Sequence, residues 1–80
     1  KSEAYIWDTR GELYYHIVEY EKSIKDMDKA LKIEKNANSY YFRGLSYLKL
    51  DKKSKACSDL SKAGELGETK AYEKISENCN

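Results

Sequence analysis

The sequence contains an internal repeat with a spacing of 33 positions. Residues 7–14 have the sequence WDTRGELY and residues 40–47 have YYFRGLSY, so that an aromatic residue, the pair Arg-Gly and a tyrosine recur at fixed offsets. A repeat of this length is typical of stacked helical pairs, because one pair cannot bury its apolar face alone. The repeat therefore predicts an all-α chain of antiparallel helix-turn-helix units, stacked as a short α-solenoid of about five helices.

Apolar and small residues recur every three or four positions in each segment of the chain, which is the pattern of a buried helix face. We expect helices over about residues 2–17, 20–34, 38–50, 53–66 and 68–78, the first beginning near Ser2. Turns are expected at Val18-Glu19 and Asp51, and Asn36 is a suitable N-cap. The last segment has no partner helix and is expected to cover the open end of the stack. The residues expected to face inward are Ala4, Trp7, Gly11, Tyr14, Ile17, Ile24, Met27, Ala30, Leu31, Ile33, Tyr40, Gly44, Tyr47, Leu48, Ala56, Leu60, Ala63, Leu66, Ala71, Tyr72 and Ile75.

Composition and charge exclude several classes of function. The 80 residues include 36% charged and 40% hydrophobic residues and no proline, which suits one small helical domain. The net charge is +1 with acids and bases interleaved, so we expect no basic face and no nucleic-acid partner. The apolar runs are too short to cross a bilayer, so we expect no membrane insertion. The chain begins at Lys1 without a visible signal peptide, and we expect a processed protein or an excised fragment.

The repeated residues resemble the tetratricopeptide repeat family, which has an aromatic residue, glycine and tyrosine on the first helix of a unit and small residues on the second. Two positions depart from the family pattern: Lys35 and Glu68 replace the proline that often ends a unit, and Arg10 and Arg43 replace a leucine before glycine. The matching residues are Trp7, Gly11, Tyr14, Tyr20, Ser23, Met27 and Ala30 in the first unit, and Tyr40, Gly44, Tyr47, Lys53, Ala56, Leu60 and Ala63 in the second.

The resemblance implies a single domain over residues 1–80, with one repeat over about 4–36, another over about 37–67 and a terminal helix over about 68–79. It also implies a protein–protein interaction module that presents a concave helical groove to a peptide or helix of a partner. The alternative is a structural role, either as the C-terminal cap of a longer repeat scaffold or as a self-associating unit. A third class, nucleic-acid binding by a related helical repeat, is disfavoured by the near-neutral charge.

Two arginines each have an aspartate 16 positions later: Arg10 with Asp26, and Arg43 with Asp59. In an antiparallel hairpin both pairs fall at the same level, so we expect one partly buried arginine–carboxylate ion pair in each repeat. The alternative is that the arginines anchor a ligand.

The two cysteines, Cys57 and Cys79, lie 10 residues before and 12 residues after Gly67. A helical hairpin turning at Gly67 brings them to the same level, so a disulfide and a pair of reduced thiols are both open. A disulfide indicates an extracytoplasmic compartment, and reduced thiols indicate the cytoplasm. Two cysteines and the single His16 do not make a zinc site. No catalytic constellation or phosphate-binding glycine pattern is present, so we expect neither enzyme activity nor a cofactor.

The family resemblance assigns the concave face to the first helix of each unit. This face is rich in tyrosines, which are common at binding hot spots. Two carboxylates stand where some members of the family hold a terminal carboxylate with lysine and asparagine, which favours a neutral or basic peptide instead. Alternatively, the tyrosines pack against further repeats or a second copy. The predicted groove residues are Tyr5, Asp8, Glu12, Tyr15, His16, Asn38, Tyr41, Leu45, Leu48 and Lys49.

Overall fold

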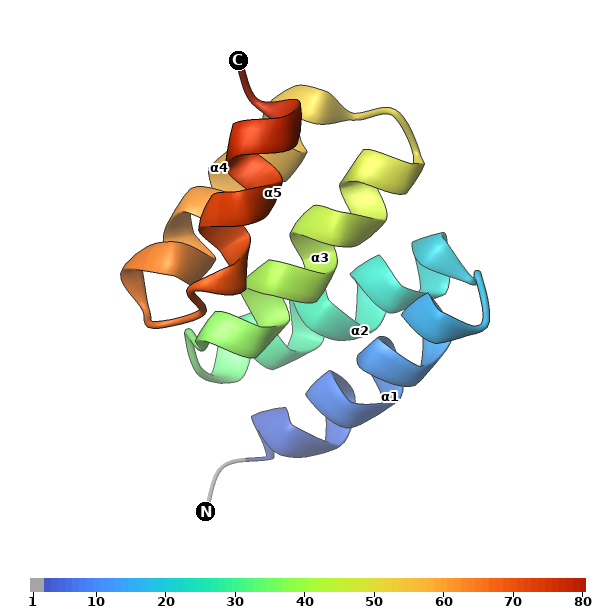
Figure 1. Cartoon of the computed structure of the whole chain (residues 1–80). Coiled ribbons are helices and arrows are strands. Elements are labelled where there is room, and N and C mark those ends of the chain that lie inside the picture. The colour runs from blue at the N-terminus through green and yellow to red at the C-terminus, as the bar shows by residue number, and fades with distance from the viewer. Residues whose placement is uncertain (1–2) are drawn as a thin grey trace.

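The computed structural model describes residues 3–80, and Ser2, where the first helix was expected to begin, lies outside this range. The described chain forms five helices and no strand: α1 (Ala4–His16), α2 (Tyr20–Ile33), α3 (Ala37–Lys49), α4 (Lys53–Glu65) and α5 (Lys70–Asn78). Each helix packs against the next one in the sequence, and α1 also contacts α3. In the view of Figure 1, α1, α3 and α5 form a layer in front of α2 and α4. The predicted all-α solenoid is therefore confirmed.

The two repeated glycines allow the helices of each pair to approach closely. A methyl group at Gly11 would lie 2.9 Å from Met27 Cε, and one at Gly44 would lie 3.0 Å from Leu60 Cγ. Met27 and Leu60 are fully buried and fill the space that the missing side chains leave. Close packing of this kind is disturbed by even one added methyl group, so these glycines help to set the distance between the helices.

The helix ends also follow local sequence signals. The side chain of Asn36 accepts a hydrogen bond of 2.8 Å from the amide of Ser39, which confirms Asn36 as the N-cap of α3. Val18 and Asp51 lie in the turns after α1 and α3, as predicted, and both have a positive φ. Gly67 has a φ of 112° in the turn after α4, where a side chain would strain the backbone.

One cluster of the hydrophobic core lies between α3, α4 and α5. Its buried members are Tyr40, Tyr41, Leu45, Leu60, Ala63 and Ala71. Ala4, Met27, Ala30 and Ala56 are buried outside this cluster. Four predicted inward residues are instead about half exposed: Ile17, Ile33, Leu66 and Tyr72. Ile17 and Leu66 are the C-caps of α1 and α4, and Ile33 is the last residue of α2, so they lie at the ends of their helices, where neighbouring helices cover less of the surface. Tyr72 belongs to α5, and its ring packs against the surface of α4 beside Gly64. No helix of the described chain meets the length and hydropathy that a membrane span requires.

Candidate functional site: a groove across α1, α3 and α5

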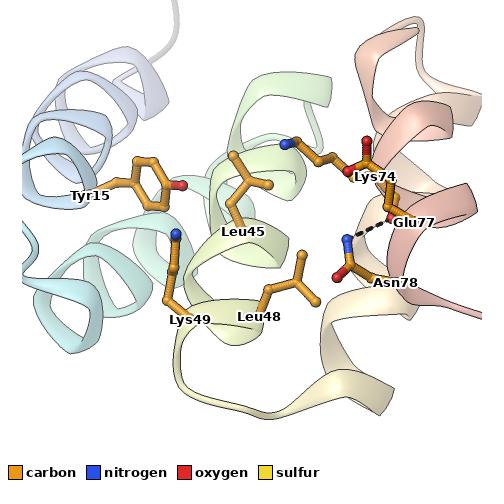
Figure 2. A pocket seen from close by; sticks show the side chains of 7 residues that line it. All are labelled: Tyr15, Leu45, Leu48, Lys49, Lys74, Glu77 and Asn78. Atoms are coloured by element: carbon orange, nitrogen blue, oxygen red, sulfur yellow. Dashed lines mark hydrogen bonds between the residues drawn. The ribbon is translucent and has the colours of Figure 1, made fainter.

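A groove of about 330 Å³ runs between α1, α3 and α5 (Figure 2). Helix α3 contributes two leucines and a lysine, α1 contributes a tyrosine and α5 contributes three polar residues. In Figure 2 the amine of Lys74 reaches from α5 toward Leu45, and the ring of Tyr15 faces the same leucine from the other side. The residues that line the groove are Tyr15, Leu45, Leu48, Lys49, Lys74, Glu77 and Asn78. The exposed surface of the groove is therefore mostly polar, with two leucine side chains among the polar groups.

Four of the predicted groove residues line this groove, namely Tyr15, Leu45, Leu48 and Lys49. The α5 residues are not among the predicted groove residues, because the last helix was expected only to cover the open end of the stack. Ile75, at helical spacing in the last segment, indicated where α5 faces the core. Residues 77 and 78 lie three and four positions after residue 74, so these three share one side of α5, next to the side that carries Ile75.

Neighbouring aromatic rings hold Tyr15 in place. Its ring centroid lies 5.4 Å from that of Phe42 and 5.6 Å from that of Tyr20. Burial raises the pKa of Tyr15 above the ordinary tyrosine value, with a smaller contribution from Tyr20. The Tyr15 hydroxyl is consequently neutral at physiological pH and is a hydrogen-bond donor at the edge of the groove.

At the other end of the α1–α3 contact, several predicted groove residues bond to one another. The side-chain amide of Asn38 donates to Asp8 at 2.9 Å and to Glu12 at 3.2 Å. The hydroxyl of Ser39 also donates to Asp8, at 2.9 Å. Imidazole Nε2 of His16 lies 3.9 Å from Glu12 and is exposed. These bonds join the two repeats, so the carboxylates are already engaged and do not line the groove.

Tyr41 and Leu45 differ most from their predicted exposure. Both were assigned to an open concave face, yet they are only 6% and 7% exposed and belong to the core with Ala71 of α5. The ammonium group of Lys70 lies 5.8 Å from the centre of the Tyr41 ring. Because α5 covers this part of α3, Leu45 reaches the groove but Tyr41 does not. Tyr5 is 67% exposed and does not line the groove either.

The two arginines form the side-chain pairs that the spacing predicts. Arg10 donates to both oxygens of Asp26, at 2.8 and 3.0 Å, and Arg43 donates to both oxygens of Asp59, at 2.8 and 2.9 Å. Arg43 makes a further bond of 2.8 Å to Asp28, which joins the two repeats and which the 16-residue spacing does not predict. The hydrogen bonds to aspartate raise the pKa of both guanidinium groups. This geometry matches structural pairs better than ligand anchors, because the carboxylates occupy the donor edges.

A disulfide joins Cys57 of α4 to Cys79, the C-cap of α5, with a Cα–Cα distance of 5.8 Å. It fastens the far end of α5 to the second repeat. Among residues 3–80, no three His, Cys, Asp or Glu side chains lie together in a group that would hold a metal ion.

Comparison with known proteins gives one clear match. A sequence model of the family described as Tetratricopeptide repeat matches residues 4–36 and 37–66, which together span most of the chain. No curated protein matches the chain. The matched ranges correspond to the α1–α2 pair and the α3–α4 pair, and α5 lies outside them.

Proposed function

Because the chain belongs to the tetratricopeptide repeat family, whose repeats generally mediate protein–protein interaction, we propose that it binds a peptide of a partner protein in the groove across α1, α3 and α5. The family is typically a non-enzymatic interaction module. The observation that carries the proposal is the composition of the groove, in which two leucines and a tyrosine ring lie among groups that donate and accept hydrogen bonds. Such a combination is typical of sites that take one apolar anchor and fix its orientation with a few polar groups.

The chemistry of the groove favours a neutral peptide with one bulky apolar side chain. Leu45, Leu48 and the ring of Tyr15 offer apolar contact to that side chain. The amines of Lys49 and Lys74 stand at the rim, where they can donate to the carbonyl groups of the peptide backbone. A basic peptide is a poorer match than the sequence suggests, because Asp8 and Glu12 are bonded to Asn38.

Selection of peptides from a random library, followed by a titration, tests this proposal. The selected peptides should share an apolar residue, and on titration the largest NMR shift changes should fall in α1, α3 and α5. Leu48→Asp should abolish binding, because it places a carboxylate among the apolar side chains of the groove. Leu66→Asp is the matched control, since Leu66 is half exposed and lies outside the groove. Equal binding by the two folded variants would refute the groove as the site.

A second candidate function, stacking against another helical unit or a second copy, is supported by the outer face of α1. Ile6, Leu13 and Ile17 lie on one side of this helix and are all more than half exposed. The positions 33 residues after Ile6 and Leu13 are Ser39 and Ser46, which are fully buried. The face of α3 that is equivalent to this exposed face of α1 is therefore buried, because the first repeat packs against it.

Light scattering tests the self-association form of this candidate. We expect the mass to rise with protein concentration and to return to the monomer value in the Leu13→Gln variant, which keeps the helix but removes an exposed apolar contact. A monomer at every concentration would exclude self-association through this face.

A further inference from the structure

A second face of the protein carries lysines that lie beside aromatic rings at equivalent positions of the two repeats. Lys22 and Lys29 of α2 correspond to Lys55 and Lys62 of α4, and Lys25 lies between the first two. We call these residues the lysine face; none of them lines the groove across α1, α3 and α5. They border two shallow depressions of about 230 and 240 Å³, one in each repeat.

Aromatic rings lie close to the ammonium groups of this face. The ammonium nitrogen of Lys29 lies 4.3 Å from the centre of the Trp7 ring. In the second repeat, the ammonium nitrogen of Lys62 lies 5.6 Å from the centre of the Tyr40 ring. Cation–π attraction restricts the positions of such groups, so the two repeats present them at equivalent places.

Among residues 3–80, none of the five lysines of this face forms an ion pair, although Glu65 lines a neighbouring depression together with Lys62. The two aspartates at the floor of the depressions, Asp26 and Asp59, are almost fully buried and are bonded to Arg10 and Arg43. One edge of the Arg10 guanidinium also remains unbonded on this face.

The structure thus corrects the expectation that the chain has no basic face. Acids and bases alternate along the sequence, but the helix period gathers several lysines on one side. Lys22, Lys25 and Lys29 are spaced by three and four residues, so they share one side of α2. A face with unpaired charges of one sign attracts ligands of the opposite charge.

We propose that the lysine face binds an acidic peptide segment, rich in glutamate or aspartate, of a partner protein. The ammonium groups supply the charge, and carboxylates at intervals along an extended peptide complement the two equivalent sets. A single-stranded nucleic acid fits less well, because such ligands stack their bases on open aromatic faces. Here the rings of Trp7 and Tyr40 are already occupied by lysine and arginine side chains.

Trp7 provides a direct readout, because it is the only tryptophan of the chain and contacts Lys29. We expect an oligoglutamate peptide at low ionic strength to change the fluorescence of Trp7 in a saturable manner, and an oligoglutamine peptide of equal length to have no effect. Binding should weaken as salt is added, since the charges are exposed. The peptide selected for the groove should bind independently of oligoglutamate, which separates the two proposals.

Two charge-matched triple variants complete the test. Replacing Lys22, Lys55 and Lys62 with glutamine should weaken oligoglutamate binding by about tenfold, as expected for the loss of three exposed ion pairs. Replacing three exposed lysines that line neither depression, namely Lys52, Lys53 and Lys70, changes the net charge equally and should leave the affinity within about twofold of the wild type. Circular dichroism establishes that both variants are folded.

Three outcomes would overturn the proposal. The first is that oligoglutamate binds no better than oligoglutamine. The second is that the two triple variants lose affinity equally, which would indicate attraction by net charge alone. The third is that a single-stranded oligonucleotide of equal charge binds more tightly than oligoglutamate and is lost with the same three lysines.

Discussion

Val18 has the left-handed backbone conformation (φ 68°) that β-branched residues avoid. The amides of Val18 and Glu19 donate back to carbonyl groups in the last turn of α1, at 3.1 and 2.8 Å. This pair of bonds is a Schellman motif, whose left-handed position is usually occupied by glycine. The same pair ends α3 and α4, where Asp51 (φ 61°) and Gly67 (φ 112°) hold that position. We therefore expect Val18→Gly to stabilise the protein.

The expected gain follows from three contributions. The left-handed conformation costs an L-residue about 1–2 kcal/mol, and the greater freedom of glycine in the unfolded chain offsets about 0.5–1 kcal/mol of that. Val18 is 65% exposed, and an unfolded chain already covers about 10–40% of its apolar surface, so little burial is lost. The net gain is about 0.5–1 kcal/mol, which should raise Tm by about 2–8 °C in a domain of this size.

Thermal unfolding followed by circular dichroism measures this effect, and Gly67→Val is the reverse control. No atom lies within 4 Å of a Cβ built at Gly67, so this substitution changes the backbone preference without a steric clash. The same two backbone contributions, with their signs reversed, give an expected cost of about 0.5–1 kcal/mol. A Val18→Gly protein that is no more stable than the wild type, beside a destabilised Gly67→Val protein, would refute the strain at Val18.

Four further variants test the packing, the disulfide and the pH dependence of the stack. In urea unfolding, Gly44→Ala should lose about 1–2 kcal/mol, because its methyl group meets a leucine branch point and a backbone oxygen. Gly11→Ala should stay within about 1 kcal/mol of the wild type, because the tip of a methionine can move and alanine favours the helix. Replacing Cys57 and Cys79 with serine opens a loop with a sequence separation of 22 and should cost about 3 kcal/mol in the same assay. Burial raises the pKa of the Tyr41 hydroxyl, so the stability that the neutral side chain contributes is complete below about pH 10 and is lost as the pH rises through the folded-state pKa. Tyr41→Phe should therefore reduce the loss of unfolding free energy at alkaline pH. Urea unfolding at several pH values measures this loss.

The helical pairs were predictable from the sequence because their contacts repeat. Gly11 and Gly44 occupy equivalent places, and each faces a large buried residue of the second helix, Met27 or Leu60. The 16-residue spacing of arginine and aspartate follows from the same hairpin geometry. Contacts within a unit depend on helix period and turn position, and both can be read from one sequence.

The exposure of the concave face was not predictable in the same way, because it depends on what lies at each end of the stack. Asp8 and Tyr41 occupy equivalent positions, yet Tyr41 is buried because α5 covers it, whereas Asp8 contacts the following repeat. The polar wall of the groove comes from α5, which lies outside both repeats. The lysine face was missed because net charge carries no information on how a fold separates acids from bases.

The groove and the lysine face should therefore depend differently on the disulfide. Helix α5 has only nine residues, and isolated helices shorter than about 12–15 residues are marginal in water. Its position relies on Ala71 and Ile75 in the core and on the bond from Cys79 to Cys57. Because α5 supplies one wall of the groove and none of the lysine face, loosening it should weaken peptide binding in the groove. The same change should leave binding of oligoglutamate unaffected, since α1 to α4 carry the lysine face.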